Sequence, residues 1–273
     1  MIEHKETLML DIWRETVKVR FGDVDRSDRL TLGSVFSFFQ EAAISHAALL
    51  GVGREALART GQAWILSRLS LFVERRPVCG ETIEVSTWPR GCEKLFARRD
   101  YEIRDGQGSA VIRGRGGWLV LDVEKRRPLR AQAIVDPLPR NDGIDAFPAG
   151  AKGLEQKANL EKNSARKALY SDIDFYGHAN NARYIQWIQD VTDIDILTQA
   201  GQFRLDINYL SEVKPGDTVE LWTAPLEESG ETDGEEFSGC YPSPPGPGFA
   251  YEGRRPDSGL AVFRAELRTD GTR

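Results

Sequence analysis

Residues 172–187 read DIDFYGHANNARYIQW, and this stretch decides the fold. It places Asp174 and His178 four residues apart, directly before a segment whose apolar spacing predicts a helix. Only three histidines occur in the chain, so a histidine at this place is a candidate for chemistry. Asn180 or Asn181 is a natural N-cap, because its side-chain oxygen can accept a free N–H of the first helical turn. The stretch therefore predicts a polar turn that leads into a helix.

A weaker copy of this stretch lies near the N-terminus. At a shift of 149 residues, Asp23 aligns with Asp172 and Asp25 with Asp174. A second match, at a shift of 136 residues, relates GETIEV at 80–85 to GDTVEL at 216–221. Matches of residue type and order at both places indicate a tandem repeat.

Each half is predicted to run from a strand through a polar turn into a helix and then into further strands. Apolar residues at spacings of three and four predict the two helices at about 31–50 and 181–199. Runs rich in β-branched and aromatic residues predict strands at 15–21, 63–72, 82–88, 96–104, 110–122, 168–170, 203–210, 217–224 and 261–268. A long helix wrapped by an antiparallel sheet, twice in one chain, is an α+β plan.

Two segments lack these patterns. The first half is predicted over residues 1–135 and the second over 166–273, and the Pro-, Ala-, Gly- and Lys-rich residues 136–165 are the expected linker. Residues 226–258 begin acidic and pass into a Pro–Gly run, a composition that buries too little apolar surface to offset its ordering entropy. We therefore expect a mobile loop over 226–258.

Composition narrows the class of protein. Hydrophobic content of 40% and charged content of 29% are typical of a soluble globular chain. No apolar run approaches the roughly 20 residues of a membrane span, and the first residues lack a secretory signal, so a cytoplasmic protein is expected. The net charge of −6 argues against nucleic-acid binding. Three cysteines without a zinc-site spacing, and no histidine cluster, predict unpaired thiols and no metal site.

The charges are unevenly spread along the chain. Residues 90–130 carry eleven Lys or Arg against six Asp or Glu, whereas residues 206–240 carry ten acids and one base. A basic patch on an acidic protein can steer an acidic partner. The alternative is a solvated face of a sheet.

With repeat, helices and strands in place, the chain resembles the acyl-acyl carrier protein (acyl-ACP) thioesterases of plants and bacteria. The matching elements extend over about residues 12–225 and the last strand, and they are QEAA at 40–43, WILSR at 64–68, EVSTW at 84–88, RRD at 98–100 and the run from 174 to 184. The resemblance implies a double hotdog fold and hydrolysis of fatty acyl-ACP without a cofactor. It also implies an acidic acyl carrier protein as partner.

The resemblance also assigns candidate catalytic residues. The usual pattern in that family is Asp-x-Asn-x-His followed by a downstream glutamate, and Asp174, His178 and Glu212 match it. Two departures stand out: Tyr176 replaces the asparagine, and Val213 replaces a cysteine that follows the glutamate in some plant members. The second departure removes a cysteine nucleophile, and the first leaves the contact that polarises the substrate to Tyr176, Asn180 or Asn181.

These residue types suit thioester hydrolysis by water. Glu212 is the expected general base, provided that its site is partly buried, and such a base contributes roughly 10²–10⁴-fold to a rate. His178 would orient the water or the carbonyl, with Asp174 fixing its tautomer. The helix that begins near Asn181 offers N–H groups and the positive end of its dipole to an oxyanion.

The repeat supplies an internal control. His178 aligns with Arg29 at the first shift, and Glu212 with Arg76 at the second. The first half therefore lacks both groups. We expect it to hold the acyl chain while the second half performs the chemistry.

Other functions stay open at this point. An acyl-CoA thioesterase fits the same residues, and a non-catalytic acyl-binding sensor would have lost the histidine or the glutamate. A hotdog hydratase typically spaces its Asp and His one residue wider, which counts against it. Because duplication places a hotdog pair in one chain, both a monomer and a homodimer are compatible with the sequence.

Overall fold

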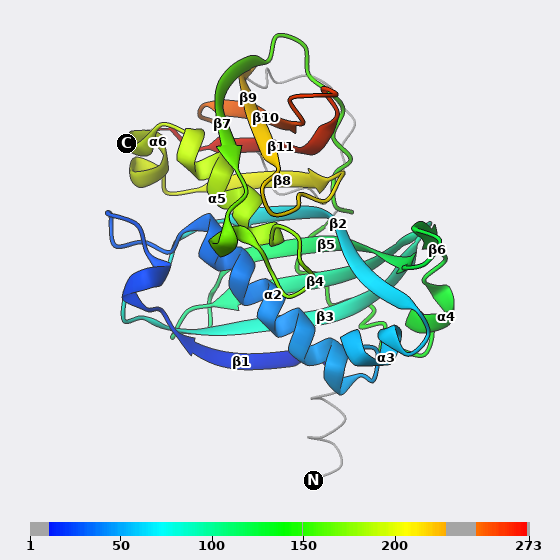
Figure 1. The fold of residues 1–273 in the computed structure, drawn as a ribbon. Coiled ribbons are helices and arrows are strands. Elements are labelled where there is room, and N and C mark those ends of the chain that lie inside the picture. The colour runs from blue at the N-terminus through cyan, green and yellow to red at the C-terminus, as the bar shows by residue number, and fades with distance from the viewer. Residues whose placement is uncertain (1–10, 149, 228–243, 272–273) are drawn as a thin grey trace, which may run out of the picture.

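The structure is a computed structural model that describes residues 11–148, 150–227 and 244–271. Its strands form one antiparallel sheet in the order β1-β3-β4-β5-β2-β8-β11-β10-β9-β7, with β6 paired to β5. Figure 1 shows the sheet rising from β1 to β7 and β9, with the helices α2 and α5 side by side against it. Both predicted helices therefore pack on one continuous sheet.

The elements of the first half are β1 (Trp13–Lys18), η1 (Phe21–Asp23), α2 (Leu32–Leu49), α3 (Arg54–Ala58), β2 (Gln62–Val73), β3 (Thr82–Glu93), β4 (Phe96–Arg104), β5 (Ala110–Asp122), β6 (Arg127–Leu129) and α4 (Gln132–Val135). Those of the second half are β7 (Glu161–Lys167), η2 (Tyr170–Asp172), α5 (Asn181–Val191), α6 (Ile194–Gln199), β8 (Phe203–Tyr209), β9 (Thr218–Leu226), β10 (Gly248–Arg254) and β11 (Ala261–Thr269). The predicted strands at 96–104 and 110–122 are confirmed without change.

The two halves repeat one topology. The order β1-β3-β4-β5-β2 in the first half corresponds to β7-β9-β10-β11-β8 in the second, and antiparallel pairing of β2 with β8 joins them. Within that pair Ser70 faces Asp206, its own counterpart at the shift of 136. The halves are thus related by an approximate twofold axis at this pair, which is the predicted double hotdog arrangement.

The central helices α2 and α5 are begun by their N-caps and packed by their apolar faces. The Thr31 hydroxyl accepts from the Ser34 N–H at 3.1 Å, and the Asn180 side chain accepts from the Ala182 N–H at 2.8 Å. Along α2 the residues Val35, Phe39 and Ala42 are buried against the sheet, as their spacing predicts.

The helices α2 and α5 also contact each other closely at Gly33. A Cβ added there would lie 2.8 Å from Gln186 Cγ, and the Gly33 N–H donates to Gln189 Oε1 at 3.1 Å. Only a residue without a side chain permits this approach. The contact fixes how the two halves meet on the helical side of the sheet.

The helix predicted over 181–199 is wrong as a single element. It ends at Val191, and Thr192 has extended backbone with ψ of 141°. The Asp193 carboxylate then accepts from the Asp195 N–H at 2.8 Å and begins α6. A capping aspartate inside the apolar pattern therefore restarts the helix in a new direction.

The first strand of the second half is also placed wrongly. The strand predicted at 168–170 is found earlier in the chain, as β7 (Glu161–Lys167). It therefore begins inside the expected linker 136–165. Its sequence, EKNSARK, shows no apolar alternation, because β7 is an exposed edge strand whose one partner among the described strands is β9.

The loop predicted over 226–258 is wrong for Gly248–Arg254, which forms β10 between β9 and β11. Residues 228–243 of that segment lie outside the described residues.

The connection between the halves is bonded to side chains of the sheet. The Ala146 N–H donates to Asp100 Oδ2 at 2.9 Å in the first half. The Leu154 N–H donates to Asn208 Oδ1 at 2.7 Å, and Lys152 Nζ bonds Glu266 at 2.6 Å, in the second half. Asp100 alternates with the core residue Tyr101, so the connection crosses the face opposite the helices.

Candidate active site

The turn before α5 is closed by its own backbone and by one carboxylate. The Asp174 N–H donates to the His178 carbonyl at 2.9 Å, and the Gly177 N–H donates to the Asp174 carbonyl at 3.0 Å. The Asp174 carboxylate accepts from the Tyr176 N–H at 2.9 Å. Gly177 has φ of +79°, a left-handed conformation that glycine adopts at little cost. The turn thus holds His178 in a fixed position.

His178 has Glu212 as its partner. The distance from His178 Nε2 to Glu212 Oε2 is 3.2 Å, so two of the three predicted catalytic residues come together. Within the described residues the Asp174 carboxylate bonds the turn backbone and makes no hydrogen bond to the imidazole. The structure therefore gives Asp174 a contact different from the tautomer-fixing bond that the sequence predicts.

Glu212 is brought to the turn by the segment after β8. The Ala179 N–H donates to the Val213 carbonyl at 2.8 Å, which ties this segment to the start of α5. The Arg255 guanidinium donates to the Glu212 carbonyl at 2.6 Å. Two backbone anchors therefore set the direction of the Glu212 side chain, although it lies outside any regular element.

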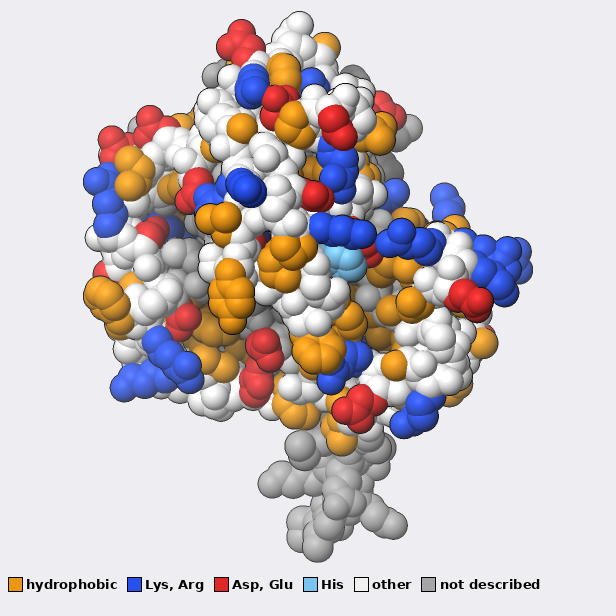
Figure 2. Space-filling view, in the orientation of Figure 1, with side chains coloured by type: hydrophobic (Ala, Val, Ile, Leu, Met, Phe, Trp, Pro, Cys, Tyr) orange, Lys and Arg blue, Asp and Glu red, His pale blue; other side chains and the backbone are white. Residues whose placement is uncertain are grey.

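The pair of His178 and Glu212 lies at the surface. Their side chains are 29% and 42% exposed, so Glu212 is more accessible than the partly buried base that the sequence predicts. Figure 2 shows a histidine surface on this face, bordered by basic and hydrophobic side chains. Water reaches the pair directly in this structure.

A buried aromatic layer lies beneath the pair. Tyr184 is 3% exposed, and its ring meets those of Tyr209 and Phe263 edge to face at 5.4 and 5.6 Å. Burial raises the pKa of the Tyr184 hydroxyl, while a hydrogen bond from the Val213 backbone opposes this. Tyr184 therefore stays protonated in a packed aromatic cluster under the segment that carries Glu212.

The remaining predicted residues lie around the pair. Tyr176 is 56% exposed, and burial of its hydroxyl raises its pKa, so the hydroxyl stays a donor at neutral pH. The Asn180 side-chain oxygen is already engaged as the N-cap of α5. The Asn181 carbonyl accepts from the Tyr209 hydroxyl at 3.2 Å. Only Tyr176 among these three presents an exposed side chain beside the turn.

The first half contributes two arginines that the sequence did not indicate as site residues. Arg126 Nη2, between β5 and β6, lies 3.6 Å from Glu212 Oε2. The Arg54 guanidinium, at the start of α3, lies 4.0 Å from the ring centroid of Phe175. Both contacts join residues that are distant in sequence, so only the fold reveals them. The candidate site is built from both halves.

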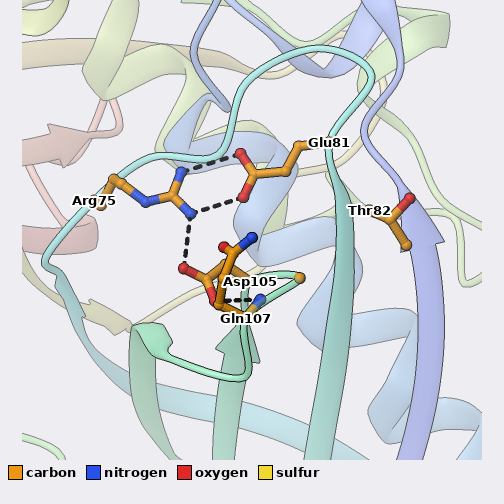
Figure 3. A pocket seen from close by; sticks show the side chains of 6 residues that line it. Arg75, Glu81, Thr82, Asp105 and Gln107 are labelled. Carbon is orange, nitrogen blue, oxygen red and sulfur yellow. Dashed lines mark hydrogen bonds and ion pairs between the residues drawn. The ribbon is translucent and has the colours of Figure 1, made fainter.

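A surface depression elsewhere holds none of the predicted residues. It is lined by the connection from β2 to β3 and by the hairpin between β4 and β5, as Figure 3 shows. There Arg75 Nη2 bonds Glu81 at 2.7 Å and Asp105 at 3.2 Å. Its charged side chains are satisfied by one another, so it presents no free group for chemistry.

Neither a membrane span nor a metal cluster is found in the described part of the chain. No helix there is long and apolar enough to cross a membrane. Over residues 11–148, 150–227 and 244–271, no group of three or more His, Cys, Asp or Glu side chains is arranged to hold a metal ion.

Comparison with known proteins gives consistent matches over both halves. The family described as acyl-ACP thioesterase N-terminal domain matches residues 11–137, and the one described as acyl-ACP thioesterase C-terminal domain matches residues 155–238. A chloroplastic palmitoyl-acyl carrier protein thioesterase of Cuphea hookeriana is 25% identical over 239 residues, which cover 83% of this chain and 57% of that protein. The chain thus spans less than two thirds of this relative.

Solved structures share the fold over nearly the whole chain. The 12:0-ACP thioesterase from Umbellularia californica has a TM-score of 0.76 at 20% identity, covering 98% of this chain and 97% of that one. An acyl-ACP thioesterase from Bacteroides thetaiotaomicron has a TM-score of 0.73 at 24% identity, covering 94% and 97%. These likenesses establish the double hotdog fold.

Proposed function

The chain belongs to the acyl-ACP thioesterase family, and from this premise we propose that it hydrolyses fatty acyl-ACP to a free fatty acid and holo-ACP. The observation that carries the proposal is the contact of 3.2 Å between His178 Nε2 and Glu212 Oε2. An acid and an imidazole in contact, open to water and next to a helix N-terminus, supply what thioester hydrolysis needs.

Glu212 acts as the general base in this proposal. The Nε2–H group of His178 faces Glu212 Oε2, which leaves Oε1 to accept a hydrogen bond from the attacking water. As the water oxygen bonds to the thioester carbon, its proton passes to Glu212. The tetrahedral intermediate then expels the thiolate, which takes the proton from Glu212, so that the base is restored and the fatty acid is released.

The other groups of the turn position the reactants. Asp174 closes the turn that carries His178, so its contribution is to fix the direction of the imidazole. The positive end of the α5 dipole and the hydroxyl of Tyr176 face the developing oxyanion in this scheme. The bound acyl-phosphopantetheine would cover the pair and exclude bulk water during the reaction.

The test is release of free thiol from a panel of acyl-ACP and acyl-CoA thioesters. We expect turnover of acyl-ACP, and a loss of about 10²–10⁴-fold in kcat for Glu212→Gln, because the amide cannot take the proton. Glu161→Gln, an exposed acid on the edge strand β7, is the matched control and should retain activity. No thiol release by the unaltered chain would contradict the proposal and favour an acyl-binding sensor.

A further inference from the structure

The β5–β6 hairpin, defined here as residues 122–130, is the basic element next to the candidate site. Residues 123–128 and Arg130 are all exposed. Lys125 is 59% exposed and pairs with Asp122 of the same hairpin at 3.7 Å. Arg127 lies opposite Asp122 in the pairing of β5 with β6, and its charge acts on that carboxylate. Arg130 is exposed and forms no salt bridge with any described residue. With four basic and two acidic residues, the hairpin offers a net positive charge to a partner.

Most other basic residues of the predicted patch 90–130 are committed elsewhere. Arg115 is buried in a salt bridge with Asp100 at 2.5 Å. Arg90 is 10% exposed and bonds Asp145 at 2.7 Å. Arg98 pairs with Glu93, and both Arg104 and Arg113 pair with Glu102. Within the basic patch predicted over residues 90–130, the accessible positive charge is therefore concentrated on the hairpin.

The hairpin lies beside the catalytic pair. Arg126 extends from its tip to within 3.6 Å of Glu212. Arg130 is four residues further on, so its backbone lies within about 14 Å of that of Arg126. In Figure 2 basic side chains gather beyond the histidine, at the end of the molecule where Figure 1 shows β6. A carrier that presents its thioester on a phosphopantetheine arm has to sit outside the site, at this range.

An aromatic rim borders the same site. Phe175 is 81% exposed and Tyr176 is 56% exposed, and Arg54 stacks on Phe175. Exposed aromatic and arginine side chains next to each other are typical of protein interfaces. The hairpin and this rim together provide a basic and an apolar surface around the entrance.

We propose that the β5–β6 hairpin docks the acidic face of the acyl carrier protein, with Arg127 and Arg130 as its main contacts. The inference rests on the proposed function, since it names where the carrier binds during that reaction. Opposite charges near an entrance raise the rate of productive encounter by about 10–10³-fold and fix the orientation of the partner.

The test compares a carrier-bound thioester with an uncharged one that has the same acyl chain. For Arg127→Glu/Arg130→Glu we expect kcat/KM with acyl-ACP to fall about tenfold or more. The value with acyl-pantetheine, which has no carrier and no phosphate, should change less than about twofold. The neutral variant Arg127→Gln/Arg130→Gln should show a smaller loss in the same direction. Circular dichroism and thermal melting check that each variant is folded.

The matched control reverses two exposed charges at the far edge strand. Lys18→Glu/Arg20→Glu carries the same charge change at the end of β1 and just after it, so it should leave both substrates unaffected. Unchanged kcat/KM with acyl-ACP in the hairpin variants would overturn the docking proposal. An equal loss with both substrates would also overturn it. Failure of the unaltered chain to hydrolyse either substrate would instead contradict the proposed function.

Discussion

The turns at residues 23–31 and 172–180 have the same backbone and different side-chain chemistry. The Asp25 N–H donates to the Arg29 carbonyl at 2.9 Å, as Asp174 does to His178. The Leu30 N–H donates to the Pro77 carbonyl at 2.8 Å, as Ala179 does to Val213. The same backbone hydrogen-bond pattern therefore occurs twice in this chain.

The two turns differ in the side chains at their equivalent positions. In the first, Arg76 occupies the position of Glu212 and bonds Asp25 at 2.5 Å and the Leu197 carbonyl at 2.8 Å, with 2% of its side chain exposed. In the second, His178 and Glu212 face water. Arg76 thus links the first turn to the second half through a buried contact, because Leu197 lies in α6 of the second half. The comparison teaches that a repeated turn supports a buried ion pair or an accessible acid–histidine pair.

Removal of the buried cation should have the largest effect on stability. For Arg76→Ala we expect the free energy of unfolding to fall by about 3–5 kcal/mol, because Asp25 would be left without its buried partner. Urea denaturation measures this change. The double variant Asp25→Asn/Arg76→Ala should recover part of the loss. A change below about 1 kcal/mol would contradict the structural role of this pair.

Glycine at one turn and aspartate at the other provide a second test. Gly177 and Asp28 occupy equivalent positions, with φ of +79° and +60°. Gly177→Val should destabilise the fold by more than about 1 kcal/mol and lower kcat, because a β-branched residue is strained there. Gly177→Asn should cost less, since asparagine tolerates this conformation. Thermal melting and single-turnover rates check both variants, and equal effects would contradict the shared geometry.

The acid dependence of stability should trace in part to the first turn. Burial by itself would raise the pKa of Asp25, but hydrogen bonds from Ser27 and the charge of Arg76 bring it below its ordinary value of 3.8. A lowered carboxyl pKa contributes stability above that ordinary value, and the contribution is lost as pH falls through the folded pKa. Asp25→Asn should therefore weaken the loss of thermal stability between about pH 4 and about pH 2. An unchanged acid profile would show that other carboxylates dominate it.

The sequence was sufficient for the repeat, the α+β plan and the meeting of His178 with Glu212. The repeat and the α+β plan depend on local periodicity and on two matched segments, whereas the pairing of His178 with Glu212 was expected from the family resemblance. The polar edge strand β7 was missed because nothing in EKNSARK alternates, and β10 because its flanking residues resemble a loop. The position of β10 follows once the repeat is applied to β4, its counterpart in the strand order.

The chemistry around the site was less accessible to sequence reasoning. The Asp174 carboxylate was expected on the imidazole, yet it bonds the backbone of its own turn. This outcome is common for aspartate in turns, where the carboxylate accepts an N–H two residues ahead. Arg126 lies near Glu212 because the fold packs two segments that are distant in sequence against each other. No local sequence pattern predicts this contact.

The division of labour between the two turns is tested most directly by single-turnover hydrolysis of acyl-ACP in two variants at equivalent positions. His178→Ala should lower the rate of the chemical step by about 10²–10⁴-fold. Arg29→Ala removes the residue at the same place in the first turn and should leave that rate within about twofold of the unaltered chain. A loss in Arg29→Ala as deep as that in His178→Ala would contradict the assignment of chemistry to the second half.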